Sequence, residues 1–133
     1  PHLASSAASD VYKRQVIVST PQDIALLDVV KALTMFQKAS VPVLGMIENM
    51  SYWCCPDCGR IDHIFGEGGV KAEAKKRGIE MLGEIPISSQ VRKSSDSGIP
   101  IIISEPKSVQ SKNYRNIAKA IIKSVKIDEE ELV

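Results

Sequence analysis

The chain has 133 residues, of which 44% are hydrophobic and 25% are charged, a composition typical of one folded domain. Its 17 basic and 16 acidic residues give a net charge of +1, which predicts neither a nucleic-acid partner nor a polybasic membrane surface. No apolar run approaches the roughly 20 residues of a spanning helix, so no membrane partner is expected. The clustered cysteines Cys54, Cys55 and Cys58 favour metal or redox chemistry in a reducing, cytoplasmic compartment.

Residues 1–15 are small and polar and have no usable apolar period. We interpret them as a leader that is foreign to the fold, with a native surface loop as the alternative. Val16–Val18 predicts a buried parallel strand. A helix should then begin with Thr20 as N-cap, Pro21 in the first position and Asp23 as the capping-box partner. Its apolar face is expected at Leu26, Val29, Val30, Leu33 and Phe36.

Val43–Ile47 is the next predicted buried strand, and it completes a strand–helix–strand unit with parallel strands. A long irregular segment follows from Glu48 to Gly69 and contains all three cysteines. Loops of this length are uncommon inside compact domains unless they have a function. The segment is therefore the first place to look for chemistry.

The remaining elements alternate between helical and strand-like patterns. Residues 70–77 predict a charged helix that stops at Gly78, and 81–85 a third strand. Residues 90–97 predict a helical turn, 99–103 form a fourth short apolar run, and 128–133 an acidic, frayed tail. The last helix should bury one apolar face, made of Tyr114, Ile117, Ala118, Ile121, Ile122 and Val125.

These elements predict an α/β fold over residues 16–127, seen as the later part of a doubly wound, mostly parallel sheet. Ligands of such sheets bind at the carboxyl ends of the strands. We therefore expect residues 19–21, 48–50 and 86–88 to lie together on one rim of the sheet.

Cys55 and Cys58 are three positions apart, in the sequence Cys-Pro-Asp-Cys-Gly, and can turn their thiolates onto one metal or cluster. Zinc and cubane iron–sulfur sites usually need four ligands, so two are missing from this pair. They could come from a second copy of the chain, or from Cys54 and His63. A thioredoxin-like redox pair is a further reading, which the glycine-rich surroundings disfavour. The pair alone does not distinguish zinc from iron.

The order of four segments resembles the C-terminal half of the Mrp (ApbC) family, the iron–sulfur cluster carrier ATPases related to MinD and the nitrogenase iron protein. The segments are VIVSTPQDIALLDVVKALTMF, VPVLGMIENMSYWCCPDCG, IFGEGGVKAEAKKRGIEMLGEIPIS and VRKSSDSGIPIIIS, and together they span about residues 16–125. The resemblance implies a MinD-like P-loop NTPase fold. It also implies a homodimer in which Cys55 and Cys58 of both subunits bind one [4Fe–4S] cluster.

The same resemblance implies a nucleotide site. Asn49 would read the adenine edge, with an Asn that caps the turn as the alternative. Pro86 would line the other side of the base. Arg92, with Asp96, matches a family motif near the nucleotide and the dimer face, and a solvated surface pair is the alternative. Cys54 stands where the family has an apolar residue, and we expect a buried thiol.

The family's phosphate loop and the aspartates that hold Mg²⁺ are absent from this sequence. The resemblance implies that the intact protein binds ATP and Mg²⁺ and hydrolyses ATP, and that this chain alone is inactive. The leading functional hypothesis is delivery of a cluster to apo iron–sulfur proteins. A structural zinc module that dimerises through four cysteines is the alternative, and a MinD-type partitioning ATPase is the second alternative, although those lack the cysteine pair.

Overall fold

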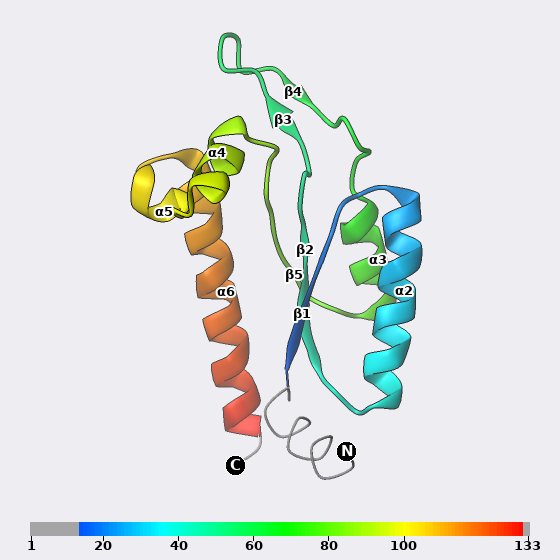
Figure 1. The fold of residues 1–133 in the computed structure, drawn as a ribbon. Helices are drawn as coiled ribbons and strands as arrows, with labels where there is room; N and C mark the ends of the chain where they lie inside the picture. Colours follow the sequence, from blue (N-terminus) through cyan, green and yellow to red (C-terminus); the bar gives the residue numbers. More distant parts are fainter. Residues whose placement is uncertain (1–13, 132–133) are drawn as a thin grey trace.

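A computed structural model of the chain describes residues 14–131, which form three layers (Figure 1). The middle layer is a parallel sheet in the order β1 (Gln15–Ser19), β2 (Val43–Glu48) and β5 (Met81–Glu84). This confirms the predicted α/β fold and its three strands. The predicted leader lies outside the described residues as far as residue 13, and Gln15 already belongs to β1.

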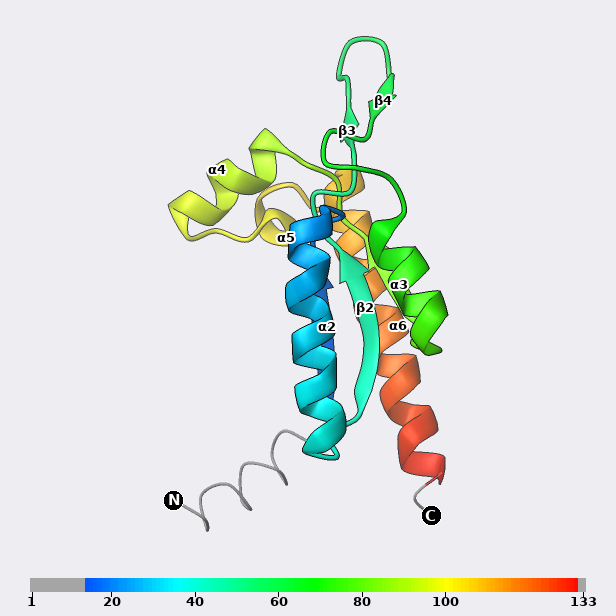
Figure 2. The same cartoon turned by 90° about the vertical axis from the view of Figure 1, so that its right-hand side faces the viewer.

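Helices cover both faces of the sheet (Figures 1 and 2). On one face lie α2 (Asp23–Lys38) and α3 (Gly69–Arg77). On the other lie α4 (Ser89–Ser97), α5 (Ile101–Ser104) and α6 (Val109–Glu131). Among the described residues, none of the helices has the length and apolar character needed to cross a membrane.

The side-chain alternation of β2 explains why the sheet has a core on each face. Met46 is fully buried against α2 and α3, whereas the next residue, Ile47, is buried on the α6 side. The first cluster of buried residues consists of Ile17, Val29, Leu33, Met46, Val70 and Ala74. The second consists of Ile47, Leu82, Ile85 and Ile117.

The predicted capping of α2 is wrong. The helix begins at Asp23, and its N-cap is Gln22, whose side chain makes no capping hydrogen bond. Thr20 Oγ1 instead donates to Gln22 Oε1 at 3.0 Å, and Pro21 is buried before the helix rather than inside it. Residues 20–22 therefore form the connection between β1 and α2.

The predicted buried face of α6 is only partly right. Ile117 is buried and Tyr114 and Ile121 are half-buried, but Ala118 is exposed and Ile122 is 55% exposed. The helix is rotated so that Ala120 packs on the core instead. The apolar run at 99–103 leads into the short helix α5, which begins at Ile101, and α6 continues to Glu131, into the predicted tail.

The segment predicted to be irregular contains a β-hairpin. Strands β3 (Trp53–Cys54) and β4 (Ile61–Asp62) are antiparallel, with Trp53 opposite Asp62 and Cys54 opposite Ile61. Each strand has only two residues, too few to give a periodic pattern in the sequence. The hairpin projects beyond the carboxyl ends of the parallel strands (Figure 1).

Candidate functional site

The carboxyl ends of the three parallel strands meet at one rim, as predicted from the sequence. Asn49 N–H donates to Ser19 O at 2.8 Å, and Ile85 N–H donates to Glu48 O at 2.8 Å. Ser51 N–H donates to Ile85 O at 3.0 Å. The chain therefore leaves β2 fixed between its two neighbours, and the hairpin rises from this fixed point.

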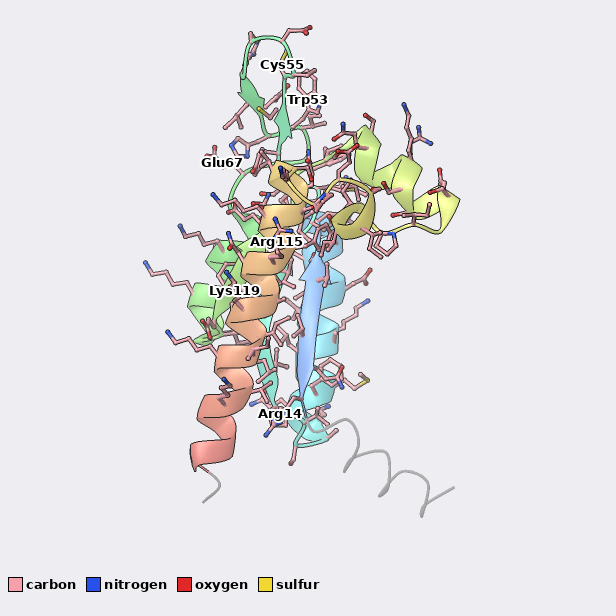
Figure 3. All side chains as sticks on the ribbon, turned by 90° about the vertical axis from the view of Figure 1, so that its left-hand side faces the viewer. Arg14, Trp53, Cys55, Glu67, Arg115 and Lys119 are labelled. Atoms are coloured by element: carbon pink, nitrogen blue, oxygen red, sulfur yellow. The ribbon has the colours of Figure 1, made fainter. Side chains whose placement is uncertain are left out.

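The cysteines lie at the tip of the hairpin, where the chain reverses. Cys55 N–H donates to Arg60 O at 2.8 Å, and Gly59 N–H donates to Cys55 O at 2.9 Å. Gly59 has φ +74°, a left-handed conformation that a glycine adopts without strain. Figure 3 shows Cys55 at the outer end of the hairpin, above Trp53. This tight turn brings Gly59 back to Cys55, so the Cys-Pro-Asp-Cys-Gly segment is closed by its own backbone.

The turn also lowers the pKa of one thiol, that of Cys55. The backbone amides of Cys58 and Asp57 and the thiol of Cys58 donate to the Cys55 sulfur, and they lower the pKa of Cys55, although partial desolvation acts in the opposite direction. These contacts place the Cys58 side chain beside Cys55. A thiol with a lowered pKa, next to a second thiol, is an arrangement that suits a metal or cluster.

Cys54 does not belong to this pair, and the prediction that it is a buried thiol is wrong, because its side chain is exposed. Its sulfur lies 3.7 Å from Gly59 O and 3.9 Å from Cys55 O. His63 lies at the base of the hairpin, where Nδ1 is 3.3 Å from Ser51 O. Among the side chains that the structure describes, no group of three or more could hold a metal ion, so Cys54 and His63 do not complete a four-ligand site in one copy.

The lowered pKa of Cys55 gives a direct chemical prediction. In the folded chain Cys55 stays a thiolate to lower pH than in the unfolded chain, because the turn supplies its donors only when folded. Its alkylation by iodoacetamide should therefore reach half of its maximal rate at a lower pH in buffer than in urea. Peptide mapping by mass spectrometry measures this for Cys55 alone. Equal midpoints in buffer and urea would contradict the hydrogen bonding of the turn.

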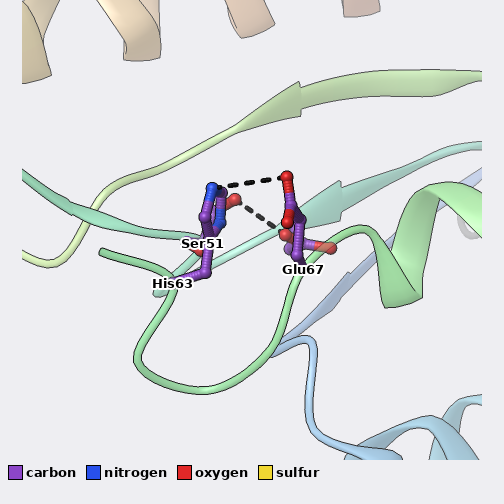
Figure 4. Close-up of polar contacts among 4 residues, drawn as sticks. Ser51, His63 and Glu67 are labelled. Carbon is purple, nitrogen blue, oxygen red and sulfur yellow. Dashed lines mark hydrogen bonds and ion pairs between the residues drawn. The ribbon is translucent and has the colours of Figure 1, made fainter. Parts of the chain in front are cut away.

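A buried carboxylate joins the two feet of the hairpin. Glu48 is 1% exposed, and its Oε1 accepts a hydrogen bond from Ser51 Oγ at 2.7 Å. Its Oε2 accepts one from the amide of Val70 at 3.1 Å, in the first turn of α3. His63 Nε2 lies 3.6 Å from Glu67 Oε1, beside this network (Figure 4). Glu48 thus fixes the start and the end of the segment that presents the cysteines.

A cavity of about 620 Å³ lies beside the base of the hairpin. It brings together Asn49, Pro86 and Arg92, the three residues that the family resemblance assigns to a nucleotide site. Trp53 and Tyr114 supply aromatic lining. Volume and lining suit a planar heterocycle with a few polar contacts. Trp53 was not predicted as a site residue, although its position just before the cysteines was a signal.

The polar groups of this cavity have local partners. Asn49 Oδ1 accepts from Met50 N–H at 2.9 Å, so the amide oxygen caps the turn while the residue stays half-buried. Arg92 pairs with Asp96 at 3.2 Å, and both side chains are exposed. Ser88 is the N-cap of α4 and accepts from Val91 N–H at 3.3 Å. The alternative interpretations, a turn cap for Asn49 and a surface ion pair for Arg92, therefore match contacts seen in the structure.

The parallel sheet, its two helical layers and the rim define the fold of the MinD-like P-loop NTPases. A MinD cell-division ATPase from Pyrococcus furiosus has a TM-score of 0.66 at 23% identity, over 84% of this chain and 43% of that one. Residues 3–122 match the ParA family, described as NUBPL iron-transfer P-loop NTPase, and the chain belongs to this family.

Relatives within the family are more similar in sequence. The iron–sulfur cluster transfer protein NUBPL of Dictyostelium discoideum is 56% identical over 112 residues, which are 84% of this chain and 35% of that protein. A nucleotide-binding protein from Archaeoglobus fulgidus, solved with ADP, is 46% identical with a TM-score of 0.58, over 65% of this chain and 35% of that one. The chain thus spans about one third of these relatives, less than the half implied by the resemblance.

Proposed function

We propose that this chain is the cluster-holding part of an iron–sulfur cluster carrier, whose cargo binds to Cys55 and Cys58. The observation that supports this most strongly is the pair itself. It consists of two adjacent sulfurs at the tip of a projecting hairpin, and two backbone amides lower the pKa of one of them, Cys55. A relative that is 56% identical is named as an iron–sulfur cluster transfer protein.

The number of ligands supports a dimer. A [4Fe–4S] cluster takes four thiolates, and each copy offers two on an exposed tip. Two copies that meet at their hairpins would complete the set, and would lose it again when they separate. Such a cluster is suited to transfer, because small changes in how the subunits meet alter its ligand set. We propose a homodimer as the holder and apo iron–sulfur proteins in the cytoplasm as the recipients.

We also propose that the whole protein binds a nucleotide. We propose that the cavity lined by Asn49, Pro86 and Arg92 holds the adenine base. Nothing in the 133 residues fits the phosphates or Mg²⁺, since the sequence contains no Gly-Lys-Ser/Thr loop. In the intact protein, hydrolysis of ATP bound with Mg²⁺ would supply the energy that changes how the subunits meet.

Metal analysis tests the function. After anaerobic reconstitution with iron and sulfide, we expect the chain to hold iron and acid-labile sulfide in equal amounts, with the brown absorbance of a cluster. A colourless protein that keeps zinc instead would support the zinc-module alternative, since four thiolates from a dimer also suit Zn²⁺. A protein that binds neither would leave the partitioning ATPase as the better reading of the fold.

ATP provides a separate prediction. Because the sequence contains no phosphate loop, we expect no measurable ATP hydrolysis and no micromolar ATP binding by the 133-residue chain. Isothermal titration calorimetry and a phosphate-release assay measure both. Saturable micromolar binding would show that the rim residues hold the phosphates themselves, and that the phosphate loop is dispensable for affinity.

A further inference from the structure

One copy of the chain presents a pair of sulfurs and no further metal ligand. Cys55 is half-buried and Cys58 is exposed, and the thiol of Cys58 interacts with the Cys55 sulfur at the tip of the hairpin. Within the described part of the chain, no third histidine, cysteine or carboxylate joins such a pair to form a metal-binding group. A single copy is therefore a two-ligand site, whatever two copies hold together.

The nearest candidates for a third ligand have other contacts. The sulfur of Cys54 lies 3.7 Å from Gly59 O. The ring of His63 stays at the base of the hairpin, with Nδ1 3.3 Å from Ser51 O and Nε2 3.6 Å from Glu67 Oε1. The number of ligands in one copy is thus set by the fold of the hairpin as well as by the sequence.

This number and the softness of sulfur select the kind of ion. Structural Zn²⁺ takes four ligands and a cubane cluster takes four thiolates, so each of them needs a second copy. Thiolates favour Cu(I) among the ions that a single copy could hold, because Cu(I) is soft. Cu(I) is also a closed-shell monovalent ion that is stable with only two sulfur ligands. The pair in one copy therefore matches Cu(I) in both the type and the number of ligands.

We infer that a single copy of this chain binds one Cu(I) ion between the sulfurs of Cys55 and Cys58. On binding, both thiols lose their protons to solvent and each sulfur forms one bond to copper, so the oxidation state of the copper does not change. Neither sulfide, a second copy nor a nucleotide is needed. Competition between copper and a cluster rests on the proposed function, since the same sulfurs are the proposed cluster ligands.

The turn that presents the sulfurs offers a way to test the geometry of this site. Cys55 O accepts the hydrogen bond from Gly59 N–H that closes the turn, and Gly59 has φ +74°. No atom lies within 4 Å of the place that a Cβ of residue 59 would occupy. A side chain at this position therefore strains the backbone without a clash and without removing a ligand.

Anaerobic competition with bicinchoninate, a chelator whose Cu(I) complex is coloured, measures the binding. We expect the reduced chain to withdraw one equivalent of Cu(I) per chain and to elute as a monomer in size-exclusion chromatography. Cys55→Ser or Cys58→Ser should weaken binding by at least about a hundredfold, because each removes one of the two ligands. Cys54→Ser is the matched control, and it should keep both the affinity and the stoichiometry.

Two variants of Gly59 separate a folded site from any two neighbouring thiols. Gly59→Val should weaken Cu(I) binding by about tenfold or more, because a β-branched residue is strained at a positive φ. Gly59→Asn should stay within about threefold of the unchanged chain, because asparagine adopts the left-handed conformation more readily. Equal affinities of the two variants would overturn the inference that the turn forms the site.

Two further results would also overturn it. The first is an equal loss of affinity in Cys54→Ser and Cys55→Ser, which would make the site a three-thiolate one. The second is one copper bound per two chains, which would require both copies.

Iron uptake distinguishes this inference from cluster carriage. The Cu(I)-loaded chain should take up no iron and sulfide until bicinchoninate removes the copper, because one pair of sulfurs cannot serve both. A chain that binds Cu(I) but no cluster would count against cluster carriage alone. A chain that takes up a cluster but leaves all Cu(I) with the chelator would count against copper binding alone.

Discussion

Replacing Cys55 or Cys58 with alanine is expected to abolish cluster binding, with at least about a tenfold loss of bound iron and sulfide. Symmetry repeats each substitution in the proposed dimer, so a single change removes two of the four thiolates. Cluster-dependent dimerisation should fall together with the iron content. Anaerobic reconstitution, followed by iron and sulfide analysis and size-exclusion chromatography, measures both.

Cys54→Ala is the matched control, because Cys54 adjoins the pair but its sulfur lies near the carbonyls of Cys55 and Gly59 instead. We expect this variant to keep its cluster and its dimer. If Cys54→Ala lost the cluster while Cys55→Ala retained it, the assignment of ligands would be wrong. If none of the three substitutions changed the iron content, the iron–sulfur hypothesis would have to be abandoned.

Glu48→Ala is expected to lower the free energy of unfolding by about 2–5 kcal/mol, because it leaves two buried donors, Ser51 Oγ and Val70 N–H, without an acceptor. Glu48→Gln keeps one acceptor oxygen and should cost less. Urea denaturation measures both. Hydrogen exchange should also show faster exchange at the amide of Val70, where the second foot of the hairpin meets α3.

Glu84→Ala is the control for this prediction, since Glu84 lies opposite Glu48 in the sheet but is exposed. It should change the free energy of unfolding by no more than about 0.5 kcal/mol. A Glu48→Ala variant as stable as Glu84→Ala would show that the carboxylate does not hold the hairpin, and that the backbone bonds of the rim suffice.

The strands and long helices were predictable because each has enough residues to show its period. β2 is apolar from Val43 to Ile47, since both of its faces are covered, and α3 is capped by Gly78, which has φ +67°. The start of α2 was not predictable from capping signals, because contacts at the rim, rather than Thr20, decide where the helix begins. The buried face of α6 was only partly predictable, because alanine and isoleucine lie on both sides of its apolar stripe and the pattern does not tell Ala118 from Ala120.

Some residues of the candidate site were predicted from the sequence, and others were not. The spacing of Cys55 and Cys58 identified the sulfur pair, and the strand ends placed Asn49 and Pro86 on the same rim. Glu48 was expected on the rim but not as a buried anchor, because a glutamate at the end of an apolar strand looks like a surface residue in the sequence. Only the structure shows that Ser51 and Val70 contact the same carboxylate, because Val70 is 22 positions from Glu48 in the sequence. The two-residue strands of the hairpin were likewise too short to recognise.

Trp53 is the single tryptophan of the chain, and it occupies the first position of β3 while also lining the cavity at the rim. All of the indole emission of this chain therefore originates from one point, between the proposed base site and the turn that presents the sulfurs. The side chain is 37% exposed, so a change in its contact with water alters the wavelength of that emission. The protein thus contains its own optical reporter for the hairpin, and cluster loading and ligand binding can be followed in solution without an added dye.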